Sequence, residues 1–196
     1  VSSFASKSAG LSEYIKTRVD ATDEMKAANF AQGDIITTVL TCARGETILL
    51  RLDTTLPRSY SRDFTVRGTK GLYMQDTNSV FLDGDEESFE PVEYYKKALN
   101  NAVKFEDEYL PGIWKNVTEE TLKAGHGGMD WFAYMGFTGA LINGEEMPVD
   151  VYDAATWQAV AVLSEMSIKQ GGAPQIMPDF TNGKWFKRPR KDVCRL

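Results

Sequence analysis

The sequence is poor in the side chains that bind metals or form disulfides. Among its 196 residues are a single histidine, His126, and two cysteines, Cys42 and Cys194. The cysteines lie far apart and show none of the spacings typical of a zinc site or of a disulfide framework. One imidazole is also too few for a histidine-rich metal centre. We therefore expect neither a metal site nor a disulfide framework.

Several motifs that would reveal an enzyme class are missing too. The dinucleotide fingerprint GxGxxG does not occur, because the one GxG, at residues 125–127, has Asp130 where the last glycine should be. The Walker phosphate loop, the HExxH zinc motif and the GxSxG elbow are absent as well. No apolar run approaches the roughly 18 residues of a membrane span. We expect no nucleotide site of these types and no membrane span.

The chain also lacks an excess of positive charge. Its net charge of −6 and its pI of about 4.9 would repel a phosphate backbone, so nucleic acid is not an expected partner. Positive side chains gather near the C-terminus: Lys187, Arg188, Arg190, Lys191 and Arg195. We interpret this cluster as a solvated tail.

What the sequence does contain is a run of β-strand patterns. Hydrophobic residues make up 42% of the chain, which is ordinary for a folded protein. From the length of the chain we expect one domain over residues 1–196. β-Branched and apolar residues dominate residues 34–42 and 46–55, a predicted hairpin, and shorter strands are predicted at 64–67, 71–75 and 79–82. In the second strand Ile48, Leu50 and Leu52 form the predicted core face.

Helical patterns lie on both sides of the predicted strands. Before them, residues 11–30 indicate a short helix or irregular excursion, and after them the spacing becomes helical from Val92. Three residues are placed to cap helices: Thr118, Asp130 and Asp150. The helices that begin at Asp130 and Asp150 are expected to end near Asn143 and at about residue 170. On the last helix Ala154, Trp157, Ala161, Ser164 and Ile168 share one face, which we expect to pack closely. Strands followed by helices indicate an α+β fold with an open, predominantly antiparallel sheet and helices packed on one face.

Two constellations could carry chemistry. His126 lies among glycines in "GHGGMDWF", where it is either a turn residue or an imidazole beside a ligand, with Asp130 or a carbonyl fixing its tautomer. In "TTLPRSYSRDF", Arg58 and Arg62 flank Tyr60. This stretch is either a surface loop or part of a substrate site. In such a site the phenol would transfer a proton while the guanidinium groups hold an oxygen-rich substrate.

The order of these motifs resembles a known family. The stretches "LPRSYSRDFTVRGTKG", "GHGGMDWF", "NGEEMPVDVYDAA" and "PDFTNGKW" look like the C-terminal half of glycoside hydrolase family 109. That family comprises bacterial NAD-dependent glycosidases, typified by α-N-acetylgalactosaminidase, within the Gfo/Idh/MocA oxidoreductase superfamily. The resemblance covers residues 2–185.

The resemblance implies a parent enzyme whose N-terminal Rossmann domain, absent from this chain, binds NAD. This chain would form the substrate side of the active site. Its sheet would form the oligomer interface, and the chain would be inactive by itself. The reaction would oxidise the sugar 3-hydroxyl, eliminate the C1 substituent, add water and reduce the ketone again. Tyr60 would be the catalytic residue, and Arg58, Arg62, His126 and Asp130 would bind an N-acetylgalactosaminide-type substrate.

Two alternatives stay open. The chain could belong to an ordinary NAD(P)-dependent sugar or polyol dehydrogenase of the same superfamily, or it could serve chiefly in oligomerisation. The sequence does not distinguish a cytoplasmic parent from a periplasmic or exported one.

Overall fold

The computed structural model of the chain describes residues 1–84 and 91–189, which divide into two compact units. The first joins residues 1–58 to the described residues from Val149 onward, and the second comprises Ser59–Pro148. That the chain folds as one domain stays a prediction.

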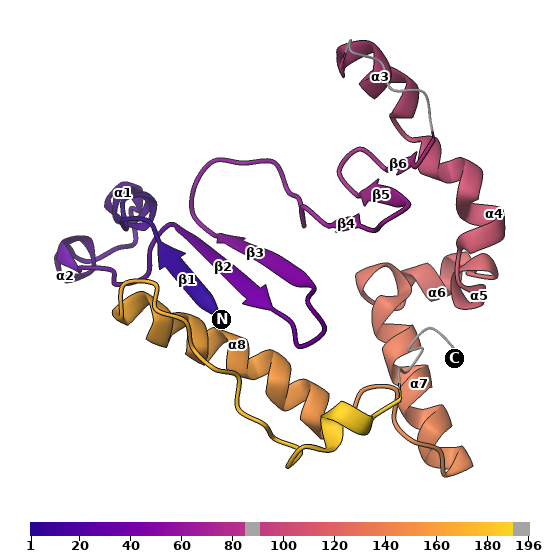
Figure 1. Cartoon of the computed structure of the whole chain (residues 1–196). Helices are drawn as coiled ribbons and strands as arrows, with labels where there is room; N and C mark the ends of the chain where they lie inside the picture. Colours follow the sequence, from indigo (N-terminus) through magenta and orange to yellow (C-terminus); the bar gives the residue numbers. More distant parts are fainter. Residues whose placement is uncertain (85–90, 190–196) are drawn as a thin grey trace. The chain divides into compact units, whose positions relative to one another are not determined.

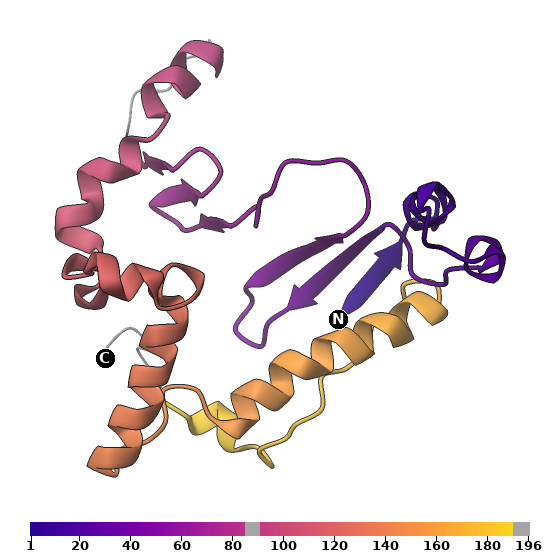
Figure 2. The ribbon, with the colours of Figure 1, turned by 180° about the vertical axis from the view of Figure 1, so that it is seen from behind.

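The first unit is a three-stranded antiparallel sheet with one long helix along it (Figure 1). Its elements are β1 (Ser2–Ala5), α1 (Gly10–Thr17), α2 (Asp23–Ala27), β2 (Ile35–Thr41), β3 (Thr47–Asp53), α8 (Val151–Lys169) and the 3₁₀ helix η3 (Lys184–Lys187). The strands lie in the order β1-β2-β3. In the view from behind, α8 runs beside β1, at the edge of the sheet away from β3 (Figure 2).

Hydroxyl groups join α8 to the sheet. The Ser3 hydroxyl donates to Thr38 over 2.8 Å, the Thr38 and Ser164 hydroxyls lie 3.0 Å apart, and Ser164 donates back to Ser3 over 2.7 Å. One turn further along α8, the Ser167 hydroxyl accepts from the Ser3 backbone N–H and donates to the Ala173 carbonyl. These four hydroxyl side chains are buried, so each needs the partners that it has.

The apolar face of β3 is not covered, contrary to the sequence prediction. Ile48, Leu50 and Leu52 are 45%, 41% and 51% exposed. Leu50 pairs directly opposite Thr38, so this face continues the one that α8 covers. The helix packs on β1, however, and β3 lies at the opposite edge of the sheet. The alternation correctly identified an apolar face but not what would bury it.

One buried carboxylate ties α1 to the sheet. Asp34, just before β2, accepts hydrogen bonds from the backbone N–H groups of Ala9 and Gly10, each at 2.9 Å, and from the Thr55 hydroxyl at 3.2 Å. It thereby caps a helix whose own N-cap residue is an alanine. A Cβ at Gly10 would lie 3.0 Å from Thr55 Oγ1 and 3.2 Å from Asp34 Oδ1, so a larger residue there would crowd the cap.

The second unit contains a smaller antiparallel sheet, a series of short helices and one longer helix, α7. Its elements are β4 (Thr65–Arg67), β5 (Gly71–Met74), β6 (Ser79–Leu82), α3 (Pro91–Ala98), η1 (Asn101–Phe105), α4 (Glu106–Tyr109), α5 (Gly112–Lys115), α6 (Glu119–Lys123), η2 (His126–Gly128) and α7 (Met129–Asn143). The Asn101 amide donates to and accepts from the Val80 backbone, and the Ser79 hydroxyl donates to the Ala98 carbonyl. Side chains thus fasten the helical segment to the edge of β6.

The α+β class is confirmed, with two open three-stranded antiparallel sheets in place of one. The predicted strands correspond to β2 through β6, with small differences at their ends, and β1 was missed. Thr118 and Asp150 cap their helices as expected, the latter in a capping box with Asp153. Among residues 1–84 and 91–189, no helix is both long and apolar enough to cross a membrane. Cys42 is a free thiol, and Cys194 lies outside the described residues.

The predicted buried face of α8 is wrong in detail. Trp157 is 62% exposed, and Ala154 and Ala161 are exposed, whereas Leu163, Ser164 and Ser167 are buried. The helix packs closely through small side chains, as predicted. Of the predicted face, however, only Ser164 is buried, together with Leu163 and Ser167 from outside it.

The Asp34 cap should make stability depend on pH. The N–H groups of Gly10 and Ala9, with the Thr55 hydroxyl, hold the pKa of the Asp34 carboxyl below its ordinary value of about 3.9. Because the folded-state pKa is depressed, the carboxylate stabilises the fold above pH 4 and this contribution is lost as the pH falls through the folded-state pKa. Asp34→Asn should therefore unfold at lower urea than the wild type at pH 7, with the difference shrinking below pH 4.

Circular dichroism during urea unfolding at several pH values would measure this difference. Glu46→Gln, at an exposed carboxylate in the turn between β2 and β3, is the control and should unfold like the wild type. Equal midpoints for Asp34→Asn and the wild type at pH 7 would contradict the cap's role.

Candidate functional site

The histidine lies in a turn with left-handed backbone between α6 and α7. His126 itself has φ of 42°, and Gly125, Gly127 and Gly128 have φ of 90°, 67° and 92°. Its Nδ1 atom lies 2.7 Å from Asp130 Oδ2. A Cβ at Gly125 would lie 2.6 Å from the same oxygen, so only glycine leaves room for the carboxylate. The glycines therefore allow the imidazole and the carboxylate to meet.

Asp130 is not the helix cap that the sequence predicted. Gly128 occupies the N-cap of α7 and makes no side-chain cap, and Asp130 lies within the first turn. There its charge suits the positive end of the helix dipole, and its carboxylate accepts the hydrogen bond from His126.

The pair leaves one imidazole nitrogen available. When Nδ1 carries the proton that Asp130 accepts, Nε2 of the neutral ring has a free lone pair. The side chains of His126 and Asp130 are 76% and 61% exposed, so a ligand could reach them. An imidazole oriented in this way can accept a proton or bind a hydroxyl group.

The other predicted residues lie on the loop between β3 and β4. Tyr60 is 82% exposed, and Arg62 is exposed without a hydrogen bond or ion pair to any described residue. Arg58 Nε lies 3.7 Å from Asp53 Oδ1, an atom that is buried and has no other partner among the described residues.

Ser61, which sequence reasoning passed over, fixes the loop between Tyr60 and Arg62. Its hydroxyl donates to the Asp76 carboxylate at 2.6 Å and accepts from the Asp63 N–H at 2.7 Å. Asp76 lies in the turn between β5 and β6, so the loop is tied to the second sheet. The cue in the sequence was the serine two residues before Asp63, the pattern of a side-chain turn.

The structure brings together some of the predicted residues. His126 contacts Asp130, whereas Tyr60 forms no hydrogen bond with either within the described part of the second unit. Arg58 is the last residue of the first unit's N-terminal segment. No group of three or more metal-binding side chains occurs among residues 1–84 and 91–189.

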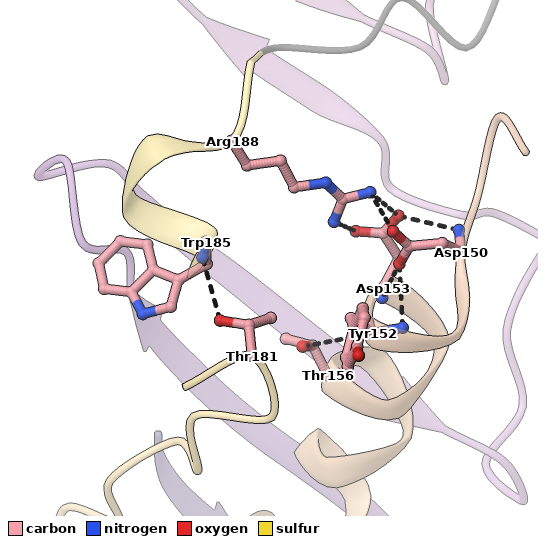
Figure 3. A network of polar contacts seen from close by, with 7 residues as sticks. All are labelled: Asp150, Tyr152, Asp153, Thr156, Thr181, Trp185 and Arg188. Carbon is pink, nitrogen blue, oxygen red and sulfur yellow. Dashed lines mark hydrogen bonds and ion pairs between the residues drawn. The ribbon is translucent and has the colours of Figure 1, made fainter. Parts of the chain in front are cut away.

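Arg188 departs furthest from the sequence prediction, which placed it in a solvated tail. Its Nη1 and Nη2 donate to the Asp153 carboxylate over 2.8 Å and 2.9 Å, and Nη2 also lies 2.7 Å from Asp150 Oδ2 (Figure 3). The Arg188 side chain is only 26% exposed. A bidentate pair on the capping box of α8 is a strong anchor for the segment that follows the helix. Residues 190–196 of the cluster lie outside the described residues.

Comparison with known proteins identifies the family. A family model described as "Glycosyl hydrolase 109, C-terminal domain" matches residues 1–187. The chain belongs to this family. The resemblance seen in the motifs is thereby confirmed.

The relatives of this family 109 domain include bacterial enzymes. It is 42% identical over 189 residues to a glycosyl hydrolase family 109 protein of Stenotrophomonas maltophilia, covering 96% of this chain and 40% of the relative. It is 37% identical over 191 residues to an alpha-N-acetylgalactosaminidase of Tannerella forsythia, covering 96% and 38%. A third, of Shewanella oneidensis and with the same enzyme name, is 32% identical over 186 residues, covering 94% and 40%. The chain spans about two fifths of the length of these relatives.

The contact between His126 and Asp130 predicts a single tautomer. At a pH where the ring is neutral, the proton should reside on Nδ1, because Asp130 accepts it there. Long-range ¹H–¹⁵N correlation NMR would report the tautomer from one unambiguous imidazole, since His126 is the only histidine. Asp130→Ala should remove the preference. A predominant Nε2–H form in the wild type would contradict the pairing.

Proposed function

We propose that this family 109 domain, acting as one unit over residues 1–196, forms the substrate side of an NAD-dependent glycosidase that cleaves α-N-acetylgalactosaminides. The observation that carries the proposal is the family match over residues 1–187. Two relatives named alpha-N-acetylgalactosaminidase support the substrate class. The overall reaction is transient oxidation of the sugar, elimination of its C1 substituent, addition of water and re-reduction.

NAD is held outside this chain in this proposal. The glycine turn at 125–128 follows a helix, α6, and not the strand that a dinucleotide fingerprint requires. The described residues thus offer no site of that type. A separate dinucleotide-binding domain would bind NAD, which supplies the oxidation and re-reduction.

Tyr60 is the proposed catalytic residue. Such a reaction needs a group that moves a proton at the sugar, and a phenol can do so. The 82% exposed ring is free to meet a substrate, while Ser61 holds the backbone beside it. Arg58 and Arg62 would donate hydrogen bonds to sugar oxygens.

His126 and Asp130 are the second proposed contact with the sugar. Asp130 fixes the ring, and the exposed Nε2 would hydrogen-bond a substrate hydroxyl. Asp130 in this view acts through the imidazole as a positioning residue.

The domain is also proposed to pair with a second copy through its sheet. The exposed apolar face of β3, with Ile48, Leu50 and Leu52, supports this role. Exposed apolar side chains that lie in a row typically mark an interaction surface.

The function can be tested by expressing the domain with and without an upstream dinucleotide-binding domain. Release of nitrophenol from nitrophenyl α-N-acetylgalactosaminide is expected only from the longer protein, because the sequence of this chain lacks the dinucleotide fingerprint GxGxxG. Turnover by the chain alone would refute the division of roles. Stoichiometric conversion of added NAD⁺ to NADH with free sugar would instead favour the dehydrogenase alternative.

Tyr60→Phe in the longer enzyme tests the catalytic assignment. Loss of a group that transfers a proton should lower kcat by about 10²- to 10⁴-fold. Tyr109→Phe is the control, because Tyr109 is a 69% exposed tyrosine of the same unit that the site does not use. A kcat equal to that of the wild type would remove Tyr60 from the mechanism.

A further inference from the structure

The backbone that carries His126 is unfavourable for a side chain of its size. His126 has φ of 42° and lies in a run of residues at positive φ that includes Gly125, Gly127 and Gly128. Glycine adopts this region without strain, whereas other residues held there are concentrated at functional sites. A turn alone would form more readily with glycine at this position. The imidazole therefore has a use that offsets the strain.

The turn is held firmly against α6. The Gly128 N–H donates to the Gly125 carbonyl at 2.8 Å and closes the turn. Gly128 is buried, and a Cβ on it would lie 3.2 Å from the Thr121 carbonyl oxygen, so the backbone of the turn packs directly on the helix. The Thr118 hydroxyl, which accepts from the Thr121 N–H at 3.2 Å, caps that helix. The imidazole thus projects from a fixed backbone.

Asp130 determines which imidazole nitrogen exchanges protons. Because Nδ1 lies 2.7 Å from Asp130 Oδ2, the carboxylate can hold the Nδ1 proton in both the neutral and the charged ring. Nε2, which has no hydrogen-bond partner among residues 1–84 and 91–189, is then the nitrogen that gains or loses a proton. A carboxylate placed behind an imidazole in this way orients the ring for proton transfer at its other nitrogen. The pair is therefore suited to more than a static hydrogen bond.

The proposed reaction includes two opposite proton transfers at the oxygen on C1. When the C1–O bond breaks, its electron pair goes to the glycosidic oxygen, and an alcohol leaves readily only if this oxygen also receives a proton. When water then adds at C1, the water oxygen must lose a proton. A single group can act as the acid in the first step and as the base in the second.

We propose that His126 protonates the leaving oxygen and then takes a proton from the incoming water. This assignment rests on the proposed function and names the oxygen that Nε2 meets there. In the first step Nε2 of the charged ring donates its proton to the glycosidic oxygen as the C1–O bond breaks, and the ring becomes neutral. In the second step Nε2 accepts a proton as the water oxygen bonds to C1, which restores the charged ring.

These transfers balance within the proposed reaction. The C2 proton is removed for the elimination, and the electron pair left at C2 forms a C1–C2 double bond as the leaving group departs. The proton returns to C2 when water adds, and the hydride removed from C3 at the start is returned at the end. The net change is hydrolysis, so the step needs no further oxidant. Tyr60, proposed for another proton transfer, belongs to the same compact unit as His126.

Substrates with different leaving groups test the assignment. Nitrophenolate can leave without a proton and methoxide cannot, so methyl α-N-acetylgalactosaminide depends on the acid far more than the nitrophenyl glycoside does. In the longer enzyme, His126→Gln should raise the ratio of kcat/KM for the nitrophenyl glycoside to kcat/KM for the methyl glycoside about 100-fold. Asp130→Ala should raise the ratio too, because Asp130 positions the ring. The ratio does not depend on the fraction of enzyme that is folded.

Glu120→Gln is the matched control. Glu120 is an exposed carboxylate on α6 that forms no hydrogen bond with His126 or Asp130, and its replacement should leave the ratio at the wild-type value. If His126→Gln lowers kcat/KM equally for both substrates, the acid role is overturned and His126 is a contact to another sugar hydroxyl.

The same assay separates this assignment from the proposed function. A wild-type enzyme that cleaves neither substrate would refute the glycosidase function, and the role of His126 would fall with it. A wild-type enzyme that cleaves both, combined with an unchanged ratio in His126→Gln, would refute the role of His126 alone. A raised ratio in His126→Gln and Asp130→Ala, but not in Glu120→Gln, supports the assignment.

Discussion

A ring of hydroxyl groups determines how α8 sits on the first sheet. The Ser3, Thr38 and Ser164 hydroxyls satisfy one another, and each such hydrogen bond contributes about 1 kcal/mol. The larger effect is on specificity, because a buried hydroxyl without a partner costs about 1–3 kcal/mol. Moving α8 by one turn would break the contacts of Ser164 with Thr38 and Ser3 and leave only the bond between Ser3 and Thr38. The position of α8 on the sheet in turn fixes the position of the capping box at its start and of the segment that follows its end.

The limits of prediction differ between strands and helices. Alternation of apolar and β-branched residues located β2 through β6 closely, because the pattern is local. β1 was missed, since Ser2 and Ser3 carry no strand signal and the strand forms by pairing with β2. The face of α8 was predicted only in part: Ser164 was included, but Ser167 was missed, because its partners are backbone groups, which a hydrophobic pattern does not count. On β3 the pattern correctly identified the apolar side of the strand. It did not show that α8 packs on β1 and leaves that side exposed.

The candidate site was predictable to the extent that its contacts are local. His126 and Asp130 are four residues apart, a spacing that lets side chains meet around a helix start. The role of Asp130 was misassigned because the left-handed Gly128 shifts the cap to an earlier position. Arg188 could not be predicted, since its partners Asp150 and Asp153 are remote in sequence and its basic neighbours resemble a tail. The sequence around Tyr60 also does not reveal that Ser61 ties the loop of Tyr60 to Asp76.

The segments with proposed functions share a means of support. The loop of Tyr60 and the turn of His126 are each held by a carboxylate, from Asp76 and Asp130. An apolar core could not do this, because it would draw the side chains inward; within the described residues, Ala98, Ala140 and Leu163 are the buried apolar side chains. The bonds of Ser61 fix the backbone beside Tyr60, and the bond to Asp130 fixes the His126 ring through Nδ1, while the phenol and Nε2 stay accessible. Exposure of the tyrosine and the imidazole is therefore compatible with a defined position, as substrate binding requires.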